Sequence, residues 1–224
     1  MTRCRFGRRL NRKRLSRLLL VMVVGLLITL WLDHPVYLAC LSLPRTGDAD
    51  WHRMLRVYGY APLWLVAAAA IACVDSSQIS KMGLLRAIHR PLLLLMSVAL
   101  TGVTVEMLKL LTRRVRPNLS DGVFAWRPWL DHPLHNGGLS TPSSHAAVAF
   151  AGTWMLCRFF PRASPVWLAL ALGCAMTRVL NEAHYVSDVW LAALVSYMVA
   201  DMLYRQHMRN ERRHAIAVRR LSRS

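Results

Sequence analysis

Three residues that could carry out phosphoryl or proton chemistry lie close together in the sequence: Arg178, His184 and Asp188. If a helix begins near residue 184, His184 and Asp188 are four residues apart and share one of its faces. A carboxylate within reach of one ring nitrogen fixes the tautomer of a histidine, so the other nitrogen can attack or accept a proton. The permanent forked cation of Arg178 suits an oxyanion or a phosphate. Because such residues at a membrane surface can also be simple anchors, these three alone do not establish a site.

A second group of candidates lies at residues 141–145, directly before an apolar segment. Small hydroxyl residues at the start of a helix offer backbone N–H groups and side-chain donors to an anion. Ser143 or Ser144 could equally serve as an ordinary N-cap of that helix. His145 distinguishes the group, because it would supply a second proton carrier at the same membrane depth as His184.

The composition indicates a polytopic membrane protein. Hydrophobic residues make up 55% of the 224 positions, and the formal net charge is +18. A soluble domain with so much apolar surface would carry balanced charges, whereas a membrane protein confines its charges to loops and tails. The five cysteines are scattered without a CxxC spacing, so the sequence predicts neither a zinc site nor a disulfide framework.

Six apolar segments predict an all-α fold with six transmembrane helices in one bundle, forming a single domain over residues 18–204. The predicted spans are residues 18–32, 61–74, 91–111, 146–160, 166–180 and 189–204. Residues 1–17 and 205–224 are strongly basic, and we expect both to be cytoplasmic tails attracted to anionic lipid. A basic N-terminus also occurs in signal peptides and nucleic-acid-binding arms. The apolar segment that follows at once favours a retained first span without a nucleic-acid partner.

Two basic tails on one side of the membrane require an even number of crossings, which six satisfies. Residues 33–60, 112–145 and 181–188 then lie on the outer side, and residues 75–90 and 161–165 on the inner side. We therefore expect both termini in the cytoplasm and both groups of candidate residues at the outer face, which in a bacterial inner membrane faces the periplasm. The sequence does not indicate the oligomeric state.

A third group of candidates conflicts with this orientation rule. Arg113, Arg114 and Arg116 cluster just beyond the third span, with Lys109 in its last turn. Cations on the side where topology disfavours them indicate a role beyond orientation. Glu106 lies one turn before Lys109 and is predicted to pair with it, because a phosphate site gains nothing from a nearby carboxylate.

The three groups have the order and spacing of a known family. The first signature, Lys, six residues and Arg-Pro, is matched by Lys109, Arg116 and Pro117. The second, Pro-Ser-Gly-His, is matched by Pro142, Ser143 and His145, with Ser144 in the glycine position. The third signature is Ser-Arg followed by five residues, a histidine, three residues and an aspartate. Arg178, His184 and Asp188 match it, and Thr177 replaces the serine. Over about residues 90–204 the chain thus resembles the type 2 phosphatidic acid phosphatase superfamily, whose site is shared with vanadium haloperoxidases.

The resemblance implies a membrane lipid phosphatase, and because no cluster of carboxylates suits magnesium or zinc, we expect it to need neither metal nor cofactor. His184, held by Asp188, would attack phosphorus to give a phosphohistidine, and His145 would protonate the leaving oxygen and then activate water. The phosphoryl oxygens would be bound by Lys109, Arg116, Ser143, Ser144 and Arg178. Ser144 places a Cβ where the family usually brings bare backbone to the phosphate.

A site at the membrane surface is reached most easily by a phosphate carried on a lipid, such as phosphatidate, phosphatidylglycerol phosphate, polyprenyl pyrophosphate or lipid A. Residues 118–140 would meet the head group, although Trp126 and Trp129 could equally be interface anchors. Two other functions remain open. One is an anionic-lipid transporter or flippase that uses the same cations without chemistry. The other is a non-enzymatic membrane scaffold whose basic tails recruit nucleic acid or anionic lipid. A haloperoxidase is disfavoured, because those relatives are soluble.

Overall fold

The structure is a computed structural model that describes residues 12–44, 47–76 and 84–221. These residues form an all-helical protein in which no strand occurs, so the predicted fold class is confirmed. The helices are α1 (Arg12–Leu41), α2 (Asp50–Val57), α3 (Ala61–Ser76), α5 (Leu84–Thr112), α6 (Ser144–Phe159), α7 (Ser164–Leu180) and α8 (Val186–Leu221). Short 3-10 turns, η1 and η2, lie at Pro117–Leu119 and Pro161–Ala163.

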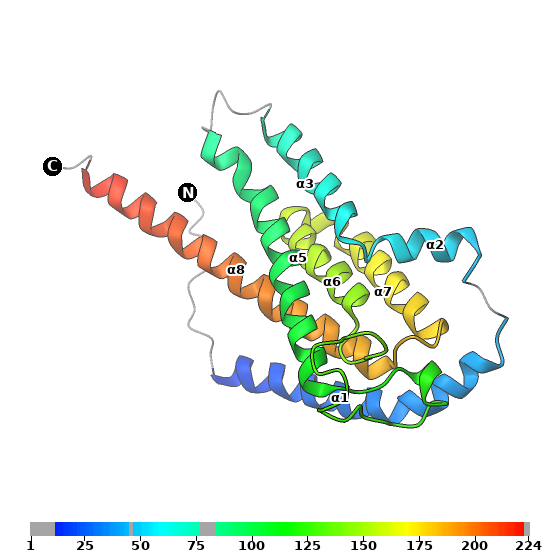
Figure 1. The fold of residues 1–224 in the computed structure, drawn as a ribbon. Coiled ribbons are helices and arrows are strands. Elements are labelled where there is room, and N and C mark those ends of the chain that lie inside the picture. Colours follow the sequence, from blue (N-terminus) through cyan, green and yellow to red (C-terminus); the bar gives the residue numbers. More distant parts are fainter. Residues whose placement is uncertain (1–11, 45–46, 77–83, 222–224) are drawn as a thin grey trace.

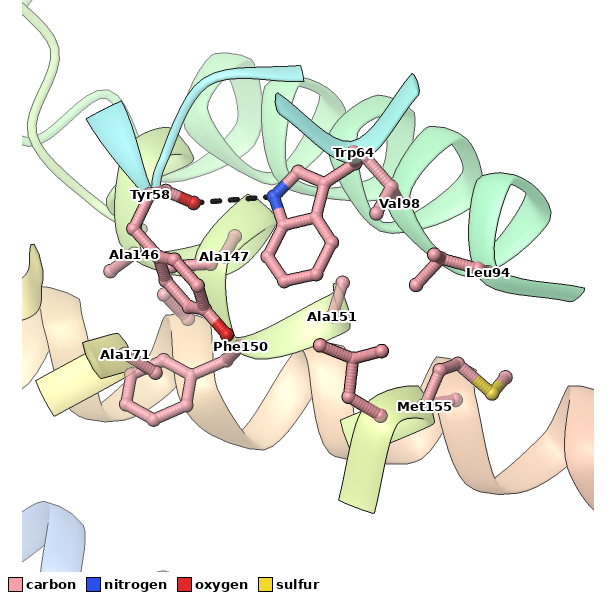
Figure 2. Packing of buried hydrophobic residues seen from close by; sticks show 14 of the residues in the cluster. Tyr58, Trp64, Leu94, Val98, Ala146, Ala147, Phe150, Ala151, Met155 and Ala171 are labelled. Carbon is pink, nitrogen blue, oxygen red and sulfur yellow. Dashed lines mark hydrogen bonds between the residues drawn. The ribbon is translucent and has the colours of Figure 1, made fainter. Parts of the chain in front are cut away.

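Helix α6 is the centre of the bundle and packs against α5, α7 and α8 (Figure 1). Its side chains are mostly small, and small residues allow neighbouring helices to approach closely. Gly152 shows how close this approach is, because a Cβ added there would lie 2.1 Å from the ring of Trp64 in α3. The Trp64 Nε1–H donates to the Tyr58 carbonyl oxygen at 3.2 Å, and the buried side chains of α3, α5 and α6 pack around this indole (Figure 2).

Four helical segments are long and apolar enough to cross a membrane, which makes the chain an integral membrane protein. They are Leu19–Leu41, Ile88–Thr112, Pro161–Leu180 and Val186–Arg213. The pair α2 and α3 would add a fifth span if counted together, although the two helices are bent by 65°. Helix α6 has only 16 residues, about 24 Å of helix. The predicted number of six spans is therefore not confirmed.

Helix α1 extends beyond the predicted first span and lies across the end of the bundle where α5 ends and α8 begins (Figure 1). The span was predicted to end at residue 32, but the helix continues to Leu41. The reason is that Asp33, a polar residue that breaks the apolar pattern, is buried in contacts with the start of α8. Trp190 of α8 packs over Gly25 of α1, where an added Cβ would lie 2.3 Å from the indole ring.

Two further segments differ from the prediction. Residues 50–57, assigned to an outer loop, form helix α2. Residues 205–221 of the predicted C-terminal tail continue α8, whose end projects beyond the other helices (Figure 1). Within α8, Asp201 pairs with Arg205 at 2.5 Å one turn later, which supports continuation of the helix past the predicted end of the last span. Residues 1–11 of the N-terminal tail, 77–83 of the inner loop and 222–224 lie outside the described residues.

Candidate active site

The turn between α7 and α8 places His184 in a buried position with a defined tautomer. Its Nδ1 lies 2.9 Å from the carbonyl oxygen of Ser140. Because a carbonyl oxygen only accepts, Nδ1 must carry the hydrogen, and Nε2 then keeps its lone pair. Asp188 had been expected to fix this tautomer, but its Oδ2 is 3.8 Å from Nδ1, beyond hydrogen-bond distance. The main chain at Ser140 therefore orients the ring, and Asp188 acts on it through charge.

Burial also sets the charge state of His184. The side chain is 2% exposed, and this burial, helped by the nearby charges of Arg178 and Lys109, lowers the pKa of His184 to about 4. The imidazole is therefore neutral near pH 7, which is the form that a nucleophile requires.

The Asp188 carboxylate is held by four donors. Its Oδ1 accepts hydrogen bonds from Arg114 Nη1 at 3.1 Å and from the Thr141 hydroxyl. Its Oδ2 accepts from the Tyr185 N–H at 2.8 Å and from the Ser140 hydroxyl. A fully buried carboxylate with this many partners is both ionised and fixed in position.

Arg114 connects this carboxylate to Asp33 in the C-terminal third of α1. The Arg114 Nη2 lies 2.9 Å from Asp33 Oδ2, and Asp33 also accepts from the N–H of Ser187 at 2.8 Å and from its hydroxyl. Sequence reasoning did not assign Asp33 to the site. Its signal was a lone carboxylate directly after the apolar run at residues 18–32, because ionisable residues beside such a run are rare and usually paired.

Lys109, Glu106 and Ser144 form a compact cluster between α5 and α6. Lys109 Nζ donates to Glu106 Oε1 at 3.3 Å, which confirms the predicted pair, and also to the hydroxyl of Ser144. The Ser144 hydroxyl donates in turn to Glu106. Ser144, which occupies the family's glycine position, therefore holds the ammonium group of Lys109 through its hydroxyl.

Ser143 and His145 begin helix α6. Ser143 is its N-cap, because the Oγ accepts a hydrogen bond from the Ala146 N–H at 3.5 Å, and its hydroxyl hydrogen can still be donated. The Nε2 of His145 is buried and has no hydrogen-bond partner within the described part of the chain. Since buried polar atoms are normally paired, this nitrogen is suited to bonding a ligand.

Two arginines complete the site. Arg178 is 7% exposed in the last turn of α7, and its buried Nε has no hydrogen-bond partner among residues 12–44, 47–76 and 84–221. Arg116 Nε donates to the Leu139 carbonyl oxygen at 3.3 Å, and burial lowers the pKa of Arg116.

The structure thus brings all eight predicted site residues to one end of the bundle. They are Lys109, Arg116, Ser143, Ser144, His145, Arg178, His184 and Asp188.

The loop between α5 and α6 is organised by Arg113, which the sequence grouped with the site cations. Its guanidinium donates to the carbonyl oxygens of Arg127 at 3.2 Å and of Pro128 at 2.9 Å, and it is 1% exposed. Arg113 is therefore a structural residue. Trp126 and Trp129 in this loop are each 62% exposed, so they are available to an interface or a head group.

Potential metal ligands gather at the other end of the molecule. His89 of α5 and His207 and Glu211 of α8 have ligand atoms within 4.8 Å of one another. Among the described residues, this is the group whose geometry suits a metal ion, and it contains none of the site residues.

Comparisons with known proteins agree with this geometry. A sequence model of the PAP2 superfamily matches residues 90–212, more than half of the chain, and the chain therefore belongs to this superfamily. The family resemblance read from the three signatures is thereby confirmed.

Two curated relatives act on phosphorylated lipids, according to their names. A lipid A 1-phosphatase of Rhizobium johnstonii is 34% identical over 98 residues, 43% of this chain and 39% of the relative. A probable diacylglycerol pyrophosphate phosphatase 1 of Schizosaccharomyces pombe is 27% identical over 143 residues, 50% of this chain and 51% of the relative. The chain thus spans about half or less of the length of the curated relatives that it matches.

A solved structure shares the fold. It is the transmembrane PAP2-type phosphatidylglycerolphosphate phosphatase of Bacillus subtilis, with a TM-score of 0.60 over 85% of this chain and 96% of that one. The sequence identity is 16%, so this likeness shows the fold alone.

Proposed function

We propose that this protein is a metal-independent lipid phosphate phosphatase that works through a phosphohistidine at His184. The observation that carries the proposal is the contact between His184 Nδ1 and the Ser140 carbonyl oxygen, which leaves Nε2 free as a nucleophile. The family and its lipid phosphatase relatives support the reaction class.

In the first step, His184 Nε2 attacks phosphorus, and the bond from phosphorus to the lipid oxygen breaks. Burial and neighbouring cations lower the pKa of His145 to about 4, so its protonation depends on the negative charge of the bound phosphate. The protonated His145 then donates a proton to that oxygen, which leaves as a lipid alcohol or a lipid phosphate. In the second step, His145 takes a proton from water, whose oxygen attacks the phosphohistidine and releases inorganic phosphate. Asp188 stabilises the positive charge that His184 acquires when its Nε2 bonds to phosphorus.

The cations around the two histidines would bind the three oxygens of the transferring phosphoryl group. Arg178 and Arg116 each present a guanidinium without a carboxylate partner in the described ranges, and Lys109 adds an ammonium. The Ser143 hydroxyl and the N–H groups in the first turn of α6 would add neutral donors. Preorganised donors of this kind stabilise the charge that shifts in the transition state.

The substrate class is inferred from the position of the site at the ends of membrane helices. A phosphate carried on a lipid reaches this depth by diffusion within the bilayer, and both curated relatives are named for lipid-linked phosphates. We infer a phosphomonoester or a pyrophosphate of such a lipid. The exposed Trp126 and Trp129 would lie at the interface near the head group.

We further propose that the site faces the outer side of a bacterial inner membrane, with both termini in the cytoplasm. The support is the charge distribution, because the basic end of α8 lies at the opposite end of the bundle from the site (Figure 1). A reporter that works only in the cytoplasm is expected to be active when it is fused after Ser224. If a reporter that works only in the periplasm is active at that position instead, the proposed orientation is wrong.

The decisive test of function is phosphate release by the purified protein in detergent, with a chelator present throughout. We expect release from at least one lipid phosphate in a panel of phosphatidate, phosphatidylglycerol phosphate, polyprenyl pyrophosphate and lipid A. Vanadate should inhibit it, because vanadate adopts the pentacoordinate geometry of phosphorus in the transition state.

Two outcomes would contradict the proposal. Loss of turnover in EDTA with recovery in magnesium would show that the reaction needs a metal. Tight lipid binding without phosphate release, unchanged in His184→Ala, would instead indicate a transporter or flippase that uses the same cations.

A further inference from the structure

Arg56, in helix α2, is a cation near His145 that belongs to none of the three signatures. The side chain is half-buried, and its Nε is buried without a hydrogen-bond partner in the part of the chain that the structure describes. Its Cζ lies 5.8 Å from the centre of the Tyr60 ring, and that ring meets the His145 ring edge-on at 4.9 Å. Arg56 therefore reaches the site from the side on which His145 lies.

Close backbone contacts fix α2 in this position. A Cβ added at Gly59, just after α2, would lie 2.8 Å from the carbonyl oxygen of His145. A Cβ added at Gly173 of α7 would lie 2.8 Å from Leu55 Cδ2 in α2. Glycine at both points lets the helix carrying Arg56 pack directly against α6 and α7.

The charge of Arg56 is uncompensated. Its charge and that of Arg178 lie close enough to repel each other, and no carboxylate within the described ranges pairs with either guanidinium. By contrast, Arg53, on the same helix, is paired with Asp48 at 3.1 Å. A phosphomonoester carries about −1.5 to −2 at pH 7, and Arg178 already shares that charge with Arg116 and Lys109. The additional arginine is suited to an additional phosphate.

We propose that Arg56 forms a second phosphate subsite, which binds the inner phosphate of a lipid diphosphate. The inference rests on the proposed phosphatase function and specifies its substrate. Attack and departure lie roughly in line, so the leaving group occupies the side of phosphorus opposite His184, where His145 protonates it. Since the Tyr60 ring contacts both Arg56 and His145, Arg56 lies on that side and would meet the leaving group.

The reaction then proceeds as follows. The bond between His184 Nε2 and the terminal phosphorus forms, and the bond between that phosphorus and the bridging oxygen breaks. The electron pair remains on the bridging oxygen, whose charge is neutralised by the proton from His145 and by Arg56. The lipid monophosphate departs, and water hydrolyses the phosphohistidine. Arg56 thereby favours departure of a phosphate over departure of a neutral alcohol.

The test compares farnesyl diphosphate with farnesyl monophosphate, which share one lipid chain, as substrates of the purified protein in detergent. Wild-type protein is expected to have the higher kcat/KM on the diphosphate. Arg56→Ala should lower kcat/KM on the diphosphate by about ten- to a hundredfold, the range expected for a lost charge-assisted hydrogen bond. The monophosphate should change by less than about twofold, and Arg56→Lys should retain part of the diphosphate preference.

Arg53→Ala is the matched control, because it removes an exposed arginine from the same helix, and it should leave both substrates unaffected. The subsite would be contradicted if Arg56→Ala lowered kcat/KM equally on both substrates and Arg56→Lys did the same. It would also be contradicted if the ratio of kcat/KM between the two substrates stayed unchanged in every variant. Absence of phosphate release by wild-type protein from either compound and from the lipid panel would instead contradict the phosphatase function itself.

Discussion

Replacement of His184 by alanine is expected to abolish the phosphoenzyme and to lower kcat by on the order of 10⁶-fold, as when the nucleophile of a covalent hydrolase is removed. The reason is that the hydrogen bond from His184 Nδ1 to the Ser140 carbonyl oxygen leaves the lone pair of Nε2 free to attack phosphorus. The measurement is rapid quench with phosphorus-labelled substrate, followed by a search for protein-bound label that is acid-labile and base-stable.

His89→Ala is the control for loss of a histidine, because His89 lies in α5 at the other end of the molecule from the site. It should trap label at the wild-type rate. Asp188→Asn should fall between the two, since it leaves His184 present but removes the charge that stabilises its positive form. Recovery of acid-labile label from His184→Ala would show that another residue is the nucleophile.

The convergence of the three signatures could be predicted from the sequence because each lies at the end of an apolar segment. Lys109 is in the last turn of α5, Ser143 caps α6, and Arg178 is in the last turn of α7. Once α6 packs antiparallel to both α5 and α7, the C-terminal ends of α5 and α7 must lie beside the N-terminal end of α6. Fixed spacing within each signature then determines which side chains face one another.

The contacts that orient the site could not be predicted in the same way. Asp33 and Arg114 are 81 residues apart, and no local pattern joins them. The partner of His184 Nδ1 is a main-chain oxygen at Ser140, and a carbonyl group carries no residue-specific signal. Charged and polar residues that bind the substrate are visible in a sequence, whereas the groups that hold them are set by tertiary packing.

The helix boundaries predicted from the sequence were wrong for a related reason. The apolar pattern stops at residue 32, yet α1 continues through Asp33 because packing against α8 supplies partners for that carboxylate. The segment at residues 50–57 is polar and carries no apolar run of its own. It becomes helical as α2 packs against α7, and it is this helix that brings Arg56 to the site. Tertiary contact overrides the local pattern in α1, whereas α2 is a short amphipathic helix rich in good helix formers that a search for apolar spans does not detect.

Replacement of His145 by alanine should slow the reaction by about 10²–10⁴-fold with a natural lipid substrate, the usual cost of losing a general acid–base catalyst. With an aryl phosphate, whose leaving group needs little protonation, the first step should proceed almost normally. The same variant should then stall, because activation of water in the second step needs the same imidazole. Rapid quench should therefore show a burst of aryl alcohol and an accumulating phosphohistidine.

Tyr60→Phe provides the matched control for His145→Ala. The Tyr60 ring meets the His145 ring edge-on at 4.9 Å, and phenylalanine keeps that contact while removing only the hydroxyl. This variant should turn over the aryl phosphate without accumulating label. If His145→Ala never traps label while His184→Ala does, then the roles of the two imidazoles are reversed. The buried Nε2 of His145 would in that case be the attacking atom, and its lack of a hydrogen-bond partner in the described structure would reflect that role.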